Sequence, residues 1–128
     1  MLLVKTKIGP SKIEGIGLFA AEFIPKGTPL WKFMPGFDVV KEKKDLASLS
    51  EASREQFLKY SSNFGGKYVL GFDDSRFWNH SEQPNVKQDF SSDPFGIEIA
   101  ARDIEEGEEL TEDYKLYDDD FDRKMQIR

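Results

Sequence analysis

The sequence predicts a mainly β domain with a minor helical insert. Short apolar stretches recur between single Gly and Pro residues, and one longer stretch has helical spacing without Gly or Pro. Aromatic residues make up 13% of the chain, which is too many for a disordered protein. With 128 residues, the chain supports one hydrophobic core and has no room for a second domain. We therefore expect residues 1–128 to form one soluble globular domain.

Three short strands are expected in the first third of the chain, at residues 2–7, 17–21 and 29–33. Gly9-Pro10-Ser11 is expected to form the first break between them. The second break, Pro25-Lys26-Gly27, has residues typical of a tight turn.

One amphipathic helix is expected at about residues 43–60, because apolar residues recur there at helical spacing among charged ones. Gly65-Gly66 ends this insert, and residues 67–71 resume as a strand. Residues 73–93 are polar and rich in turn formers.

Two further strands are expected before the end of the domain. Residues 95–100 alternate like a half-buried strand, and residues 110–114 form a short last strand. Beyond them lies an acidic tail at about residues 115–128.

Charge is distributed unevenly along the chain. The net charge is −6, but residues 1–64 carry +3 and residues 65–128 carry −9. Such a field repels nucleic acids and anionic membranes and attracts basic partners. The alternative is a solvated acidic face that only keeps a small protein in solution.

The composition also excludes several kinds of site. With no Cys there is no disulfide framework, thiol nucleophile or thiolate zinc site, and the single histidine, His80, excludes a multi-histidine metal site. No metal is expected. No apolar run approaches 18 residues, so neither a membrane span nor a signal segment is expected, and a cytoplasmic location follows as an expectation.

Three segments carry chemistry, and they are KIEGIGLFA at residues 12–20, RFWNHSEQPN at 76–85 and GEELTEDY at 107–114. In this order they resemble the SET-domain family of protein-lysine methyltransferases, which use S-adenosyl-L-methionine. The resemblance runs from about Lys5 to Tyr114. It implies a SET-domain (β-clip) fold of short strands with a threaded pseudoknot near the C-terminus, in a minimal form without a Cys-rich tail.

The resemblance assigns cofactor contacts to the stretch from Gly15 through Ile16 to Gly17. Because glycine has no Cβ, this backbone can adopt φ > 0 and approach a ligand closely, leaving N–H and C=O groups to hold an amino-acid moiety. The stretch is implied to contact the methionine part of the cofactor. Its alternative is an ordinary hairpin glycine pair.

The second segment is implied to contact the cofactor through Arg76, Asn79 and His80, the last two on the adenosine side. Asn offers both a donor and an acceptor, whereas the His works through its backbone. The alternative is a turn stabilised by an Asx-type hydrogen bond, with His80 satisfied in the core. Pro84 and Asn85 are implied to help close the threaded crossing, or else to form an ordinary turn.

Tyr114 aligns with the family's catalytic tyrosine and is also implied to contact the cofactor. A phenol with a pKa near 10 stays protonated at neutral pH, so Tyr114 can orient the reacting groups without carrying charge. Its alternative is a core tyrosine with a satisfied hydroxyl.

The substrate channel is implied to include Trp31, Phe33 and Glu112. Alternating aromatic residues on a strand also suit a plain core. Glu112 stands where relatives have Phe or Tyr, a position that governs how many methyl groups fit. Without a Cys-rich tail, the acidic tail with Tyr117 and Phe121 is expected to close the channel.

The expected function is transfer of a methyl group from S-adenosyl-L-methionine to a lysine amine of a basic or lysine-rich protein. Neither nucleic acid nor membrane is expected as a partner, and a chromatin-type substrate would move the location to the nucleoid or nucleus. The alternative is a weak or inactive module that binds cofactor or protein, motivated by Glu112 and the missing Cys-rich tail.

Overall fold

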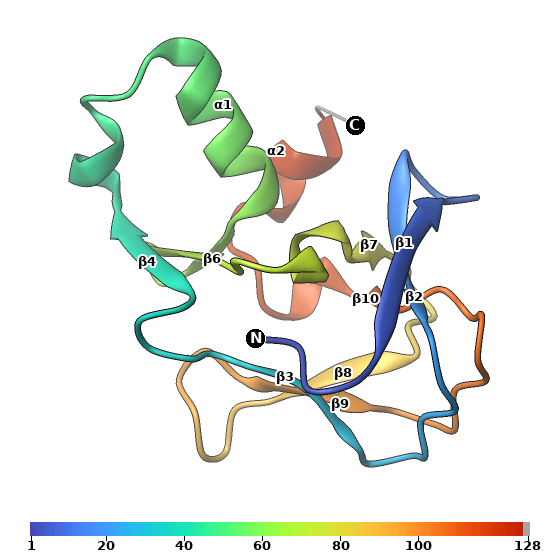
Figure 1. Cartoon of the computed structure of the whole chain (residues 1–128). Helices are drawn as coiled ribbons and strands as arrows, with labels where there is room; N and C mark the ends of the chain where they lie inside the picture. Colours follow the sequence, from blue (N-terminus) through green and yellow to red (C-terminus); the bar gives the residue numbers. More distant parts are fainter. Residues whose placement is uncertain (127–128) are drawn as a thin grey trace.

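The computed structural model describes residues 1–126. The chain forms short strands, with one helix pair lying over one end of the β-structure (Figure 1). The described residues pair into an antiparallel hairpin, two antiparallel three-stranded sheets and one short parallel pair. This mainly β architecture confirms the predicted fold class. The single-domain boundary and the tail boundary at 115–128 remain predictions, since residues 127–128 lie outside the described part.

The first hairpin joins β1 (Thr6–Pro10) to β2 (Ile16–Ala20). The prediction of β2 is correct to one residue, but the break expected at residues 9–11 is wrong in part. Gly9 and Pro10 still pair with β2, and the turn comes at residues 11–15. Pro10 can end an edge strand because its missing N–H faces away from the ladder.

The hydrophobic core lies beside the sheet β3–β9–β8, formed by Pro29–Lys32, Ile97–Ala100 and Val86–Asp89. Each fully buried Leu or Ile contributes about 1.5–3 kcal/mol. The core cluster contains Leu18, Ala20, Ile24, Leu30, Val86, Ala100, Ile104 and Leu110.

Strand β9 differs from its predicted pattern. Its most buried side chains are Ala100 and Glu98, which is 5% exposed, whereas Ile97 and Ile99 are only half-buried. A buried Glu needs a polar partner or a proton. The strand therefore turns an acidic group, and not an isoleucine, toward the interior.

The other three-stranded sheet is β4–β6–β5, formed by Val39–Glu42, Lys67–Leu70 and Ser62–Phe64. The single helix predicted at 43–60 is wrong in its first half. Lys43–Leu46 is a 3₁₀ helix, η1, and the α-helix α1 spans Glu51–Tyr60. Ser50 caps α1 by accepting the Ser53 N–H at 3.1 Å, because its side chain competes for the first free N–H groups.

The polar stretch 73–93 holds more regular structure than predicted. It contains a 3₁₀ helix, η2 (Asp74–Phe77), strand β7 (Asn79–His80) and strand β8. Strand β7 runs parallel to β10 (Thr111–Glu112), so segments far apart in sequence lie side by side.

Asn85 reinforces the contact between these two segments. Its side chain donates to the Glu109 carbonyl at 2.8 Å and accepts the Thr111 N–H at 2.9 Å. These are the two segments that the resemblance places at the threaded crossing.

The tail is helical where none was predicted. The 3₁₀ helix η3 (Tyr114–Leu116) is followed by α2 (Phe121–Gln126), which lies beside α1 in Figure 1. Helices this short leave little periodic signal in a sequence. Across residues 1–126, no helix has the length and apolarity needed to cross a membrane.

Candidate active site

Two adjoining cavities open between α1, α2 and the strands. The larger has a volume of about 300 Å³ and includes the Glu14–Ile16 backbone and Asn79 in its wall. The smaller has a volume of about 70 Å³ and lies against β9 and β10. The residues that line both cavities are Lys59, Tyr60, Arg76, Trp78, Tyr114 and Lys124. Tyr114 therefore stands where the two cavities meet.

The loop at residues 11–15 is held by Ser11, Asn79 and Glu109. Ser11 donates to the Glu109 carboxylate at 2.8 Å and accepts the Ile13 N–H at 2.9 Å. The Asn79 amide nitrogen lies 3.1 Å from the Glu14 carbonyl and 2.9 Å from Glu109 Oε2. Asn79 thus holds in place the main chain at the edge of the larger cavity.

Glycine suits two points of this loop for different reasons. Gly15 has φ = +48°, a left-handed conformation that costs an L-residue about 1–2 kcal/mol. A Cβ on Gly17 would lie 2.5 Å from Glu109 Oε2. Gly15 therefore shapes the cavity edge, and Gly17 makes room for the carboxylate behind it.

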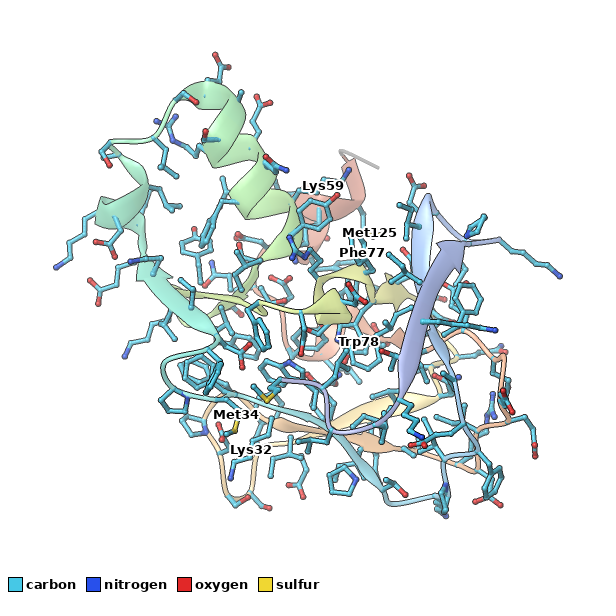
Figure 2. All side chains as sticks on the ribbon, viewed as in Figure 1. Lys32, Met34, Lys59, Phe77, Trp78 and Met125 are labelled. Carbon is cyan, nitrogen blue, oxygen red and sulfur yellow. The ribbon has the colours of Figure 1, made fainter. Side chains whose placement is uncertain are left out.

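The larger cavity suits the cofactor that the resemblance implies. Its wall combines cationic side chains, aromatic faces and exposed main chain, and Lys59 and Phe77 lie between α1 and the β1–β2 hairpin (Figure 2). Cations and main-chain amides can hold the carboxylate and amine of an amino acid, and aromatic rings can cover an apolar or cationic group. Its volume is at the lower bound for small-molecule sites.

Tyr114 is oriented by strand β7 and by Trp78, the residue directly before it. Its hydroxyl donates to the carbonyl oxygen of Trp78. Its main-chain N–H donates to His80 Nδ1 at 3.1 Å, and the two rings lie 5.3 Å apart. His80 therefore supports Tyr114 through its side chain as well as through its place in β7.

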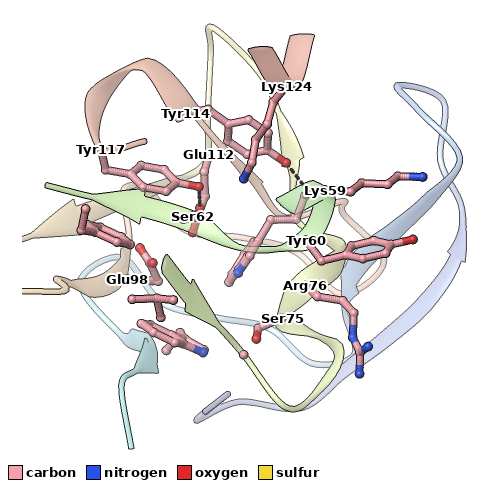
Figure 3. Close-up of a pocket in the computed structure, with 15 residues that line it drawn as sticks. Lys59, Tyr60, Ser62, Ser75, Arg76, Glu98, Glu112, Tyr114, Tyr117 and Lys124 are labelled. Carbon is pink, nitrogen blue, oxygen red and sulfur yellow. Dashed lines mark hydrogen bonds between the residues drawn. The ribbon is translucent and has the colours of Figure 1, made fainter. Parts of the chain in front are cut away.

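The smaller cavity has an acidic wall. Glu98 of β9 and Glu112 of β10 both line it, and Glu112 is 1% exposed. The Tyr117 hydroxyl donates to Glu112 Oε2 at 2.5 Å, which Figure 3 marks with a dashed line. Glu98 Oε2 and Glu112 Oε1 are buried and accept no hydrogen bond from the described residues.

Burial raises the pKa of both carboxyl groups. The pKa of Glu112 rises to about 7, although the Tyr117 hydroxyl opposes the shift. The pKa of Glu98 rises well above its usual value because of burial and the neighbouring charge of Glu112. Two carboxyls that repel each other in this way can share one proton, which would satisfy both unpaired oxygens. Burial also raises the pKa of Tyr117, so its phenol remains a donor.

Lys124 of α2 lines both cavities. Its Nζ lies 2.6 Å from Asp118 Oδ2 and 5.5 Å from the centre of the Tyr114 ring. The residue is 8% exposed, and its positive charge lowers the pKa of Glu112.

The structure gathers most of the residues predicted for the site. The larger cavity is lined by Gly15, Ile16, Arg76, Asn79 and Tyr114, and the smaller one by Trp31, Arg76, Glu112 and Tyr114.

Three predicted residues line neither cavity. Gly17 leaves room for the Glu109 carboxylate, and His80 accepts the hydrogen bond of the Tyr114 main-chain N–H. Phe33 packs against Phe95 with ring centres 4.9 Å apart, so the structure does not bring it to the channel. Within residues 1–126, no group of three or more metal-ligating side chains could hold a metal ion.

Other lining residues were not predicted from the sequence. Lys59, Lys124 and Glu98 each come from an element whose charged side chain is expected to face solvent. Tyr117 was expected to help close the channel, and it does line the smaller cavity. Phe121 instead packs 5.0 Å from the His80 ring.

The β-domain thus has two cavities that share a tyrosine in their walls. The comparison with protein families gives the particular class: the SET-domain model matches residues 15–115, and the chain belongs to this family. The resemblance seen in the sequence is thereby confirmed.

Individual relatives agree with this assignment. The chain is 29% identical over 130 aligned residues to the histone-lysine N-methyltransferase trr of Drosophila melanogaster, covering 90% of this chain and 5% of that protein. The chain thus spans only a small part of this relative's length.

Two solved structures share the fold. A Plasmodium falciparum protein described as a candidate histone methyltransferase matches with a TM-score of 0.56 and 20% identity, over 86% of this chain and 92% of that one. A humanized mutant of the Chaetomium thermophilum Polycomb Repressive Complex 2, bound to the inhibitor GSK126, matches with a TM-score of 0.66 and 24% identity, over 94% and 16%.

Proposed function

We propose that this domain transfers a methyl group from S-adenosyl-L-methionine to a lysine side chain of a protein. The observation that carries the proposal is the position of Tyr114 in the walls of both cavities. A transfer between two substrates needs a point where their sites meet, and the larger cavity suits the cofactor while the narrower one suits a lysine side chain. When bound, the cofactor supplies the methyl group on a sulfonium.

The protein's part in this reaction is to position the reactants. The loop edge at Glu14–Ile16 and the cation of Arg76 bind the amino-acid end of the cofactor, with Asn79 holding the loop. Because the Tyr114 hydroxyl donates its hydrogen bond to the Trp78 carbonyl, its oxygen would act toward the acceptor amine or the polarised methyl group as a hydrogen-bond acceptor. Such alignment supplies much of the rate in displacement reactions.

The acceptor amine must also lose a proton. A lysine with an ordinary pKa of about 10.4 is only about 0.1% neutral near pH 7.4. A narrow cavity disfavours the ammonium form, whereas a carboxylate at Glu98 or Glu112 favours it. The balance between these effects sets the pH at which the domain works.

We further propose a basic or lysine-rich protein as the substrate and a cytoplasmic location, or a nucleoid or nuclear one for a chromatin-type substrate. The support is the charge of −9 on residues 65–128, which attracts cations, and the histone-lysine activity named for the Drosophila relative.

A second candidate function is a module that binds cofactor or protein without turnover. The acidic wall of the smaller cavity favours it, because Glu112 replaces an apolar aromatic side chain with a group that holds an ammonium.

One experiment separates the two candidates. The purified protein is titrated with S-adenosyl-L-methionine by calorimetry, and is then incubated with methyl-labelled cofactor and core histones. Binding with label on histone lysines supports the enzyme, and binding without label supports the module. No heat and no thermal shift at millimolar cofactor would contradict the enzyme and the cofactor-binding form of the module.

A further inference from the structure

Lys124 is in an unusual place for a lysine on a short terminal helix. Its side chain leaves α2 and points down between Tyr114 and the region of Lys59 in Figure 3. It lines both cavities, and only 10% of the side chain is exposed. A lysine that stays buried must be held by specific partners, since leaving a charge unpaired away from water is costly.

Its partners hold the amine at a fixed place in the site. The Tyr114 ring lies 5.5 Å from Nζ, within the range of a cation–π contact. Asp118 Oδ2 lies 2.6 Å from Nζ, and the Asp118 side chain is fully buried. The charge of Lys124 also lowers the pKa of Glu112 in the wall of the smaller cavity. The chain's own amine thus stands beside the tyrosine where the two cavities meet.

Asp118 is arranged so that one oxygen faces this amine. Its Oδ1 accepts the main-chain N–H groups of Asn63 at 3.1 Å and Asp120 at 2.9 Å. Its Oδ2 makes the short contact with Lys124 and accepts no other hydrogen bond from the described residues. The carboxylate is therefore anchored by one oxygen, and its other oxygen faces the Lys124 amine.

Lys59 provides an internal comparison, because it also lines both cavities. It is exposed, its Nζ lies over the Tyr60 ring at 5.4 Å, and no carboxylate in residues 1–126 forms an ion pair with it. Proximity to the cavities is common to both lysines. Burial, the contact with Tyr114 and a proton acceptor belong to Lys124.

We propose that Lys124 is a methylation site of this domain's own active centre, modified within the same molecule. This inference rests on the proposed function. In the transfer, the Nζ–H proton passes to Asp118 Oδ2 and the nitrogen lone pair forms the new N–C bond. The C–S bond of the sulfonium breaks with its electron pair left on sulfur, which gives a methylammonium and a neutral thioether.

The test maps methyl groups by peptide mass spectrometry after incubation of the whole protein with S-adenosyl-L-methionine, with core histones added in a second arm. The expected result is one or more methyl groups on Lys124, at a rate per molecule that does not change over a hundredfold range of protein concentration. Lys115→Arg, a change outside both cavities, should keep this modification, and Lys124→Arg should remove it without transfer of the label to Lys59.

A second readout needs no turnover. Lysines are acetylated with an N-hydroxysuccinimide ester in the presence and absence of S-adenosylhomocysteine. Ligand in the larger cavity should slow the labelling of Lys124 at least tenfold, whereas Lys115, which is half exposed and paired with Glu82, should not change.

Four results would overturn the inference. Methylated histones with unmodified Lys124 would leave the proposed function standing and remove this one. Label on neither would remove both. A rate per molecule that rises with protein concentration, or equal labelling of Lys124 with and without the bound thioether, would show that Lys124 does not occupy the site in its own chain.

Discussion

The hydroxyl of Tyr114 donates its hydrogen bond to the carbonyl oxygen of Trp78, the residue directly before β7. The segment that carries Asn79 and His80 therefore also fixes the direction of the tyrosine's proton. Because that proton is committed to Trp78, the phenol oxygen can act toward the cavities only as an acceptor. This hydrogen bond joins the segment at residues 76–85 to the segment at residues 107–114.

Removing this hydroxyl tests the role of Tyr114. Tyr114→Phe should lower turnover at least tenfold and change the Kd for cofactor less than twofold, because the ring keeps its packing against His80 and Lys124. Single-turnover kinetics and calorimetry measure the two quantities. Equal losses in both would make Tyr114 a binding residue.

Asn79 should show the opposite behaviour. Asn79→Ala removes the amide that lies close to the Glu14 carbonyl and Glu109, so the cavity edge loses its support. Cofactor affinity should fall first, by a factor of about ten for one lost buried hydrogen bond. A variant with unchanged affinity and reduced turnover would contradict this reading.

The two glycines of the loop offer a matched pair. Gly17→Ala places a methyl group 2.5 Å from Glu109 Oε2 and should cost about 1–3 kcal/mol of stability together with cofactor affinity. The added methyl group of Gly15→Ala meets no atom within 4 Å, so the variant should lose only the stability that its positive φ costs, about 1–2 kcal/mol. Thermal unfolding and calorimetry separate them: a Gly17 variant with normal affinity would show that Glu109 can move without disturbing the loop.

The sequence predicted the parts of this fold that rest on local chemistry. Strand β2 and the turn at Pro25-Lys26-Gly27 follow from alternation and turn residues, and Tyr114 and Asn79 follow from motifs that the family shares. The division of the insert into η1 and α1 could have been anticipated from Ser50, a good N-cap.

Other features depend on tertiary packing and leave no local signal. Glu98 stands between two isoleucines, a pattern that predicts the acid to be outside, yet it faces the cavity wall because Glu112 and Tyr117 come from distant segments to meet it. The sequence likewise predicts that Lys124 faces solvent, whereas in the fold it is buried in an ion pair with Asp118.

The raised pKa of Glu112 gives a pH dependence of stability. In the unfolded chain this carboxyl ionises near its ordinary pKa of 4.5, whereas in the folded state it keeps its proton up to about pH 7. The folded state therefore binds more protons between these values, and stability falls as the pH rises through that window. Glu112→Gln cannot ionise and should escape the loss.

The expected result is a Tm for Glu112→Gln that exceeds the parent's by about 10 °C at pH 8, because a pKa raised from 4.5 to about 7 corresponds to roughly 3 kcal/mol of lost stability, with no difference at pH 4.5. Glu108→Gln is the control, because the hydrogen bond from Arg102 lowers the pKa of Glu108 and its contribution has the opposite sign. A Glu112→Gln variant less stable than the parent at pH 8 would show that the carboxylate is needed.

Activity should rise from pH 7 to about 9 as the acceptor lysine loses its proton. An ionised Glu112 favours the ammonium form of a nearby lysine, so Glu112→Gln should move the rise to lower pH. Initial rates on histone substrate at constant ionic strength measure both profiles. Movement to higher pH would mean that the carboxylate instead takes the proton.

The acidic tail was expected to attract basic substrates through Asp118, Asp119, Asp120 and Asp122, but the structure gives these residues different tasks. Asp118 is buried against Lys124, Asp119 accepts the Gly65 N–H at 2.8 Å, and Asp120 pairs with Arg123 at 2.9 Å. Replacing all four would therefore mix attraction with folding. Asp122 is exposed and isolates the effect of charge.

Long-range attraction acts on encounter and is screened over about 8 Å at physiological salt. Asp122→Asn should therefore lower kcat/KM for histones by about twofold at low salt, and the difference should vanish near 0.5 M salt. Asp118→Asn should lower the stability of the domain by about 1–3 kcal/mol at every salt concentration, because it leaves the Lys124 ammonium buried without its carboxylate. Kinetics across a salt series, with thermal unfolding in the same buffers, measure both effects. An Asp122→Asn variant that matches the parent at low salt would show that this charge is only solvated surface, and an Asp118→Asn variant as stable as the parent would show that Lys124 finds another partner.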